Sequence, residues 1–161
     1  MSVELADGDL FADTAECLVN AVNIVGVMGA GLAKKFAHRW PAMEASYKTA
    51  CLTKVCRIGA VHMWKTPAGY GATTWIANLP TKAHWRDPSR YDYVEKGLAD
   101  LAVKLRRYRV TSVAIPALGC GLGGLDFEQV YPLIQQAFEG FGIDVRVYPP
   151  HPAPARSRGR R

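Results

Sequence analysis

The sequence has no long hydrophobic run and little cysteine. No segment of its 161 residues approaches the roughly 18 consecutive apolar residues that a transmembrane helix requires. The first residues lack the basic and apolar regions of a secretory signal, so we expect a cytoplasmic protein without a membrane partner. The four cysteines, Cys17, Cys51, Cys56 and Cys120, include no C-x-x-C pair. We therefore expect buried free thiols, and neither a metal site nor a disulfide framework.

Acidic residues are absent from the C-terminal segment, which carries much of the net charge of +6. Four of the 20 Lys and Arg residues lie in the last six positions, which leaves 16 basic against 14 acidic side chains over residues 1–150. We interpret residues 1–150 as one domain of ordinary size. Residues 151–161 are rich in proline and arginine and are expected to form a disordered tail. This tail either holds phosphates electrostatically or is a solvated terminus without a role.

Apolar residues recur with two periods, which predicts strands and helices interleaved around one sheet. The predicted strands cover residues 3–6, 17–21, 59–65, 73–79, 112–117 and 143–148. The predicted helices run from Gly31 to Trp40, from Pro41 through residue 51, over residues 91–105 and over residues 127–138. Residues 66–71 have turn composition and suit a hairpin, and Asp126 with Gln129 forms a capping pair before the last helix. The fold class is therefore α/β with a mixed sheet.

A glycine-rich loop follows the predicted strand at residues 112–117. Gly119, Gly121 and Gly124 spell G-x-G-x-x-G between a strand and a helix. We do not assign a dehydrogenase, because the dinucleotide fingerprint opens its fold and only 37 residues remain after Gly124 here. A tight turn accounts for one or two of these glycines, but not for four in six positions. Unobstructed backbone N–H groups before a helix favour anions, so we expect a phosphate site.

An earlier loop, residues 26–31, enters a helix in the same way. It would place a second set of backbone amides near the first, and two such loops suit a diphosphate. Asn20 and Asn23 flank the approach to this loop, and an amide side chain can both donate to and accept from a ribose hydroxyl pair. The alternative is that one of these asparagines caps the turn.

Together these segments resemble the macrodomain family. The resemblance rests on residues 8–10, 19–23, 28–33 and 115–125, in matching order over residues 2–150. The segment 78–86, Asn-Leu-Pro-Thr-Lys-Ala-His-Trp-Arg, is similar to the DarG-like branch of that family, the DNA ADP-ribosyl glycohydrolases. A terminal ADP-ribose protein glycohydrolase is a more distant member of the same branch.

The resemblance implies a three-layer α/β/α macrodomain with ADP-ribose as its ligand and no cofactor. It places the adenine near Asp9, Leu10 and Tyr148, and the distal ribose near Asn20. The remaining implied ligand-binding residues are Asn23, Gly29, Ala30, Gly31, Leu32, Gly119, Cys120, Gly121, Leu122, Gly123 and Gly124. From the residues alone, Asp9 is better explained as a turn or helix cap.

Lys82 matches the catalytic lysine of this branch. It follows a predicted strand and should project into the loop layer where ligands bind. It would either stabilise charge as the glycosidic bond breaks or, as a neutral amine favoured by burial near Trp85, attack the anomeric carbon. His84, Trp85 and Arg86 lie beside it as candidate substrate contacts or as plain surface residues. The more distant member carries an aspartate where this chain has Gly123. A covalent lysine mechanism that is assisted by this aspartate therefore lacks the aspartate here.

The resemblance thus implies an ADP-ribosyl glycohydrolase acting on ADP-ribosylated DNA, on ADP-ribosylated protein or on both. The bond cleaved would be N-glycosidic to a DNA thymine, which the similarity favours, or an ester to a protein glutamate. One alternative is a reader that binds ADP-ribose without cleaving it, and another is a phosphatase acting on ADP-ribose phosphate. The loops and Asp9 are expected in an enzyme and in a reader alike, so Lys82 is the one sequence feature that distinguishes the two hypotheses. Pairing with a toxin stays open.

Overall fold

The computed structural model describes residues 2–69 and 71–150, and the predicted tail at residues 151–161 lies outside them. Six strands form one sheet in the order β1-β6-β5-β2-β4-β3. They are β1 (Val3–Leu5), β2 (Cys17–Asn23), β3 (His62–Lys65), β4 (Trp75–Lys82), β5 (Ser112–Ile115) and β6 (Asp144–Val147). Neighbouring strands are parallel except β3, which runs antiparallel to β4. The predicted mixed sheet and hairpin are confirmed.

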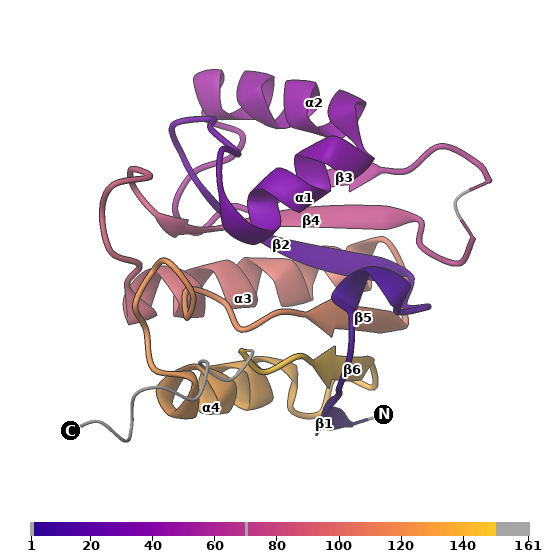
Figure 1. Cartoon of the computed structure of the whole chain (residues 1–161). Helices are drawn as coiled ribbons and strands as arrows, with labels where there is room; N and C mark the ends of the chain where they lie inside the picture. The colour runs from indigo at the N-terminus through magenta and orange to yellow at the C-terminus, as the bar shows by residue number, and fades with distance from the viewer. Residues whose placement is uncertain (1, 70, 151–161) are drawn as a thin grey trace.

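Helices cover both faces of this sheet and complete three layers (Figure 1). The helices are α1 (Gly31–Arg39), α2 (Pro41–Leu52), α3 (Tyr91–Arg107) and α4 (Phe127–Phe138). Buried side chains of α1 and α2 pack with one set of strand residues, and those of α3 and α4 pack with the other set. Each helix buries one apolar face, as the three- and four-residue spacing of its apolar positions predicts.

Alternation along the central strand β2 decides which of its side chains face which helices. Cys17 and Val19 lie in the core under α3 and α4, whereas Leu18 and Val22 lie in the core under α1 and α2. Successive strand residues point to opposite faces. Asn20, which is buried, therefore points toward the α1 and α2 layer.

Strand ends differ from the prediction where proline and glycine intervene. β4 continues to Lys82, past Pro80, which cannot donate a ladder hydrogen bond. The sheet accommodates Pro80 because β3 pairs only with residues 75–78 of β4, so the rest of β4 is an edge. The predicted strand at residues 59–65 begins only at His62, since the residues before it form a turn with Gly59 at φ +82°.

Two further local features bear on the functional edge of the sheet. A 3-10 helix, η1 (Leu10–Ala12), follows β1 and was not predicted, because three residues are too few to show a period. The predicted cap of α4 is present in part: Asp126 accepts a hydrogen bond from the Glu128 backbone amide. Over the described residues, we find no helix that combines the length and apolarity needed to cross a membrane.

Candidate functional site

Three loops meet at one edge of the sheet, because β5, β2 and β4 are parallel neighbours whose carboxyl ends lie together. Asn23 at the end of β2 lies opposite Lys82 at the end of β4. The loop after β2 enters α1, the loop after β4 carries residues 83–90, and the loop after β5 holds the glycines of residues 119–124. In α/β sheets, ligands bind beyond such strand ends.

Asn23 shapes the first of these loops. Its Oδ1 accepts hydrogen bonds from the Val25 and Gly26 amides at 3.0 and 3.1 Å, and its Nδ2 donates to the Val27 carbonyl at 2.9 Å. The Tyr47 hydroxyl donates to the Asn23 carbonyl at 2.7 Å. Both ends of this amide are therefore engaged within the protein, so Asn23 acts on the site through the shape of the loop.

Asn20 differs from Asn23, because one end of its amide is unsatisfied. The side chain is buried, and its Nδ2 donates to Asn78 Oδ1 at 3.0 Å. Its Oδ1 has no hydrogen-bond partner in residues 2–69 and 71–150. An unpaired buried acceptor costs roughly 1–3 kcal/mol, so this oxygen is suited to accept from a ligand hydroxyl.

The loop after β2 and the glycine loop touch each other. Ala30 is the N-cap of α1, and no side chain of the described residues caps that helix end. The first amides of α1 are therefore available to an anion. Leu122, which is 75% exposed, lies 3.6 Å from where a Cβ on Gly31 would be. The glycine loop therefore lies beside the uncapped N-terminus of α1.

The four glycines of the glycine loop are required for different reasons. Gly119 and Gly124 have φ of +74° and +81°, which side chains rarely adopt. A Cβ on Gly123 would overlap Ser89 Oγ and lie 2.5 Å from the Gly119 carbonyl oxygen. Gly121 has neither constraint: no described atom lies within 4 Å of its Cβ position. Its small size leaves open space, as a close approach by a ligand requires.

Ser89 joins the glycine loop to the end of β4. Its amide donates to the Gly123 carbonyl at 3.0 Å, and its hydroxyl donates to Thr81 Oγ1 at 3.0 Å. Thr81 immediately precedes Lys82, and Ser89 is buried. Nothing in the sequence points to Ser89, because its partners are 8 and 34 positions away and only the folded chain brings them together.

Lys82 stands at the rim of the site with its charge uncompensated. Its Nζ donates to the Trp85 carbonyl at 3.3 Å, and it forms no ion pair within the described part of the chain. Trp85 is 48% exposed, with the His84 ring centroid 5.1 Å and the Arg86 guanidinium 4.8 Å from its ring. The three residues after Ala83 therefore form one group of contacting side chains beside the ammonium, with the His84 and Trp85 rings tilted against each other.

Two other chemically reactive groups near the glycine loop are not activated. Burial, together with the charge of Asp126, raises the pKa of the Cys120 thiol to about 11, so it stays protonated near neutral pH. Asp126 caps α4 through its carboxylate, which accepts a hydrogen bond from the Glu128 amide. Lys82 therefore stays the candidate for a covalent or electrostatic role.

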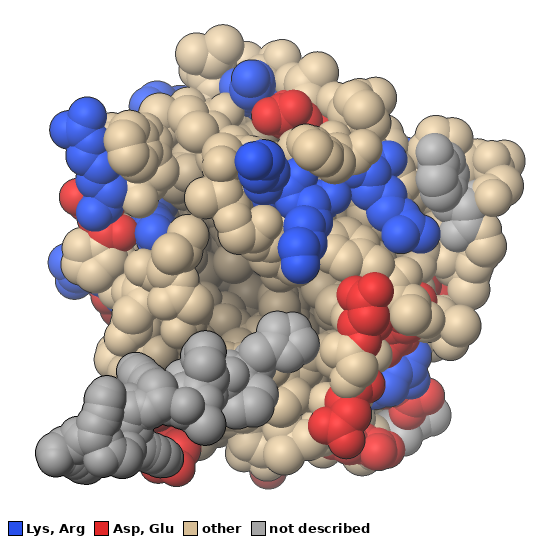
Figure 2. Space-filling model, in the orientation of Figure 1, with Lys and Arg blue, Asp and Glu red and all other residues tan. Residues whose placement is uncertain are grey.

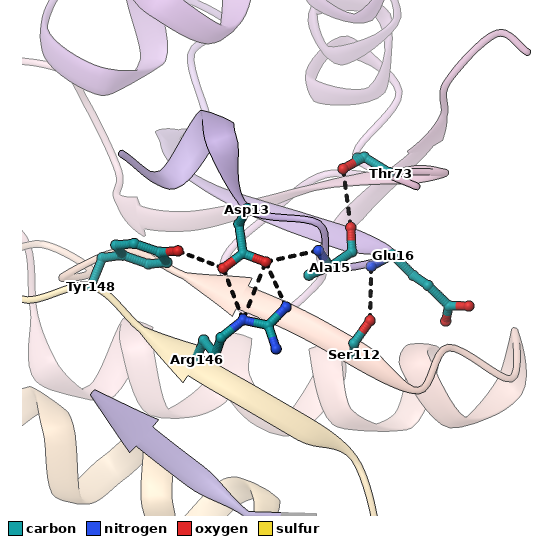
Figure 3. Close-up of polar contacts among 7 residues, drawn as sticks. All are labelled: Asp13, Ala15, Glu16, Thr73, Ser112, Arg146 and Tyr148. Carbon is teal, nitrogen blue, oxygen red and sulfur yellow. Dashed lines mark hydrogen bonds and ion pairs between the residues drawn. The ribbon is translucent and has the colours of Figure 1, made fainter. Parts of the chain in front are cut away.

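At the other end of the site, Tyr148 and the segment after β1 come together (Figure 3). The Asp13 carboxylate, only 2% exposed, accepts from the Tyr148 hydroxyl and from the Arg146 guanidinium at 2.6 Å. Burial alone would raise the pKa of Asp13, but these hydrogen bonds outweigh it and lower that pKa below 3.8. Asp13 thereby positions the Tyr148 ring beside η1.

Asp9 and Leu10 begin that 3-10 helix. Asp9 is its N-cap, and its carboxylate accepts from the Phe11 amide at 3.0 Å, as the cap interpretation predicts. One carboxylate oxygen has a contact there, and the side chain remains exposed. Leu10 is buried beneath it. Asp9 therefore caps the helix and still presents acceptor capacity to solvent.

Charge is divided across the face that shows these loops. Figure 2 shows a hollow near the centre, with basic side chains along its upper rim and acidic ones to its lower right. The upper rim is where α1 lies in Figure 1. This helix carries Lys34, Lys35 and Arg39, all exposed, and no acidic residue. Among the residues described, we find no group of three or more His, Cys, Asp or Glu that could hold a metal ion.

Comparison with known proteins gives consistent matches. The family model described as Macro domain matches residues 19–134. A curated protein of Mycobacterium tuberculosis, named DNA ADP-ribosyl glycohydrolase, is 42% identical over 149 residues, covering 92% of this chain and 42% of that protein. This chain therefore spans about two fifths of that relative's length.

Solved structures match over nearly the whole chain. The macrodomain of Mycobacterium tuberculosis DarG has a TM-score of 0.89 at 41% identity, covering 92% of this chain and 98% of that one. Thermosipho africanus DarTG, solved in complex with ADP-ribose, has a TM-score of 0.88 at 33% identity, covering 92% of this chain and 42% of that one.

Proposed function

This chain belongs to the Macro domain family, and from that premise we propose that it is an ADP-ribosyl glycohydrolase. It binds the ADP-ribose of a modified target and hydrolyses the bond at the distal ribose. One observation carries the proposal: Lys82 lies at the same sheet edge as the uncapped N-terminus of α1 and the adjacent glycine loop. Relatives named DNA ADP-ribosyl glycohydrolase support the same reaction.

The ligand lies along the loop edge, from η1 to Lys82. Its diphosphate sits between the amides at the start of α1 and those of the glycine loop, where Gly121 leaves space for it. The unpaired Oδ1 of Asn20 accepts from a hydroxyl of the distal ribose. The adenine lies toward Asp9 and Tyr148, at the opposite end from Lys82.

Lys82 is the catalytic residue, and two roles are open to it. As an ammonium without a carboxylate partner among the described residues, it stabilises the negative charge that develops on the leaving group. As a neutral amine, it bonds to the anomeric carbon while the bond to the target breaks and a proton passes to the leaving group. Water then releases ADP-ribose and restores the lysine.

DNA is the target class that the surface favours. Helix α1 carries exposed lysines and an arginine and no acidic residue, and basic side chains border the hollow in Figure 2, which suits a phosphate backbone. Trp85 is exposed between His84 and Arg86 at the rim beside Lys82, where the modified base would leave. We accordingly propose thymine-linked ADP-ribose of single-stranded DNA as the substrate, and the cytoplasm expected from the sequence as the compartment.

The test compares two substrates with the same protein. Purified wild type and Lys82→Ala are incubated with thymine-ADP-ribosylated single-stranded DNA and with glutamate-ADP-ribosylated protein, and free ADP-ribose is measured. We expect release from DNA by wild type and at least a hundredfold loss, roughly, in the variant. Release from protein alone would replace the DNA target with a protein ester.

The reader alternative has its own outcome in the same experiment. If neither substrate is cleaved while calorimetry shows tight ADP-ribose binding, the chain is an ADP-ribose reader and the catalytic role of Lys82 is wrong. Retention of ADP-ribose affinity within a few-fold by Lys82→Ala is expected of the enzyme, because the loops rather than the lysine hold the diphosphate.

A further inference from the structure

A ladder of buried polar side chains crosses the sheet behind the proposed ribose site. His62 on β3, Asn78 on β4 and Asn20 on β2 are directly opposite one another in the strand register. Asn78 Nδ2 lies 3.0 Å from His62 Nδ1, and Asn20 Nδ2 lies 3.0 Å from Asn78 Oδ1. His62 Nε2 lies 3.0 Å from Ser46 Oγ on α2. All three strand residues are buried.

The partners at each step determine the direction of every hydrogen bond in the ladder. Asn78 Nδ2 also faces the Met43 sulfur at 3.2 Å, and Asn20 Nδ2 faces the Met28 sulfur at 3.9 Å. Thioether sulfur accepts hydrogen bonds and cannot donate them, so both amides must point their NH₂ groups toward the sulfur atoms. His62 Nδ1 must then accept from Asn78, which requires the neutral imidazole with its proton on Nε2.

The surroundings of His62 favour this neutral form. Burial lowers the pKa of His62 below 6.5, and the positive charge of Lys104 lowers it further. Lys104 reaches from α3, where it is paired with Asp100 at 2.8 Å. The other polar groups that face His62 are Ser46, Asn78 and the Cys56 thiol, which lies by the His62 backbone amide. No carboxylate of the described residues touches the ring to stabilise its charged form.

We propose that His62, acting through Asn78, is a positioning residue that keeps the Asn20 amide oxygen facing the distal ribose, and that protonation of His62 reverses this amide. A proton on Nδ1 would face the Asn78 NH₂ group. Two donors would then face each other, so the Asn78 amide must rotate to present its oxygen to His62. The Asn20 amide must rotate with it, which presents NH₂ instead of oxygen to the ligand. The proposal rests on the proposed function only in taking ADP-ribose as the ligand.

The consequence is a proton-linked affinity. Reversal replaces the Asn20 acceptor by an NH₂ donor, so the ribose hydroxyl can no longer donate to Asn20 and must give up another partner to accept from it; ADP-ribose then binds about tenfold more weakly. Affinity is highest above the pKa of His62 and falls as the pH drops through that value, which lies below 6.5. By linkage, bound ADP-ribose lowers the pKa of His62 by about one unit.

Calorimetric titration with ADP-ribose across the pH range tests the proposal. Wild type is expected to show the tenfold loss in acid. His62→Gln accepts from Asn78 and donates to Ser46 but does not titrate, so its affinity no longer changes over that range. His38→Gln, which alters an exposed histidine of α1, is expected to keep the wild-type profile. If the ADP-ribose affinity of His62→Gln still falls at low pH, the proposal is overturned.

A second measurement needs no variant that might unfold. NMR titration of the His62 ring in wild type, free and with ADP-ribose, measures the linkage directly. A pKa for His62 that is about one unit lower in the complex supports the proposal, and equal values in the two states overturn it. Failure of the proposed function is distinguishable: absence of cleavage leaves both titrations unaffected, and a chain that does not take ADP-ribose as its ligand shows no binding at any pH.

Discussion

At the scale of single residues, the glycine loop separates folding requirements from ligand requirements. Gly123 is required by the fold, because Ser89 and the Gly119 carbonyl fill the space where its side chain would be. This explains why an aspartate at this position is incompatible with the present structure. Gly121, by contrast, has open space at its Cβ position among the described residues. The two positions therefore give opposite predictions.

Gly121→Ala is expected to leave the free energy of unfolding within about 0.5 kcal/mol of wild type, because the added methyl group meets no described atom. The same methyl group would obstruct the phosphates, so ADP-ribose affinity should fall on the order of tenfold. Urea unfolding and calorimetry measure the two quantities. Gly123→Ala is the matched control and should lose about 1–3 kcal/mol of stability through overpacking. Unchanged affinity in Gly121→Ala would show that the ligand does not approach this loop.

Asp13 gives a residue-scale prediction about acid stability. Its pKa is lowered in the folded state, so its contribution is present above the unfolded value of 3.8 and is lost as the pH falls through the folded value. Asp13→Asn should cost about 2 kcal/mol near neutral pH, since it weakens a buried, charged contact with Arg146 and Tyr148. The difference from wild type should shrink toward zero in strong acid. Urea midpoints measured against pH check this, and a constant difference at all pH values would contradict it.

At the scale of elements, the end of β4 and the glycine loop act as one unit. Ser89 hydrogen bonds to Thr81 and to Gly123, so it sets the position of Lys82 relative to the phosphate loop. Ser89→Ala should lose about 1 kcal/mol of stability and several-fold in turnover, because small displacements of a catalytic group are costly.

A double-mutant cycle tests this coupling. Ser89→Ala, Thr81→Ala and the double variant are compared by urea unfolding and by turnover. Because the two hydroxyls bond to each other, the double variant should cost clearly less than the sum of the single ones. Simple additivity would show that Ser89 does not act through Thr81.

Helix α1 supplies a prediction about DNA. Lys34→Glu/Lys35→Glu should weaken binding of modified single-stranded DNA and reduce its salt dependence, because fewer counterions are released. Affinity for free ADP-ribose should change much less, since backbone amides hold the diphosphate. The matched control is Arg106→Glu/Arg107→Glu in the last turn of α3, with the same change in charge. Equal effects of the two pairs on DNA binding would show that α1 is not a DNA-binding surface.

At the scale of the whole molecule, the sequence predicted the layers well and the contacts within the site poorly. Periodicity and the Gly and Pro positions predicted four helices, the mixed sheet and the hairpin, because these depend on local pattern. They did not predict that β4 runs through Pro80, which depends on where β3 stops pairing.

Contacts between residues distant in sequence limited how much of the site could be predicted. Lys82 and the two loops could be found from motifs, since each is a continuous segment. The ladder from His62 to Asn20 depends on the register of three strands, and Asn78 lies 58 positions from Asn20. Polar residues inside apolar strands were the available signal, but without the register they could not be joined into one network.

The most direct test of the central claim is single-turnover release of ADP-ribose from thymine-ADP-ribosylated single-stranded DNA by wild type, Lys82→Ala and Lys82→Arg. Wild type should cleave and Lys82→Ala should not, although it still binds ADP-ribose. Lys82→Arg keeps the charge without a nucleophilic amine, so partial activity in this variant would assign the electrostatic role to Lys82. No activity in this variant would assign the covalent role. Cleavage by Lys82→Ala at the wild-type rate would contradict the account, because the reaction would then not depend on the lysine at the end of β4.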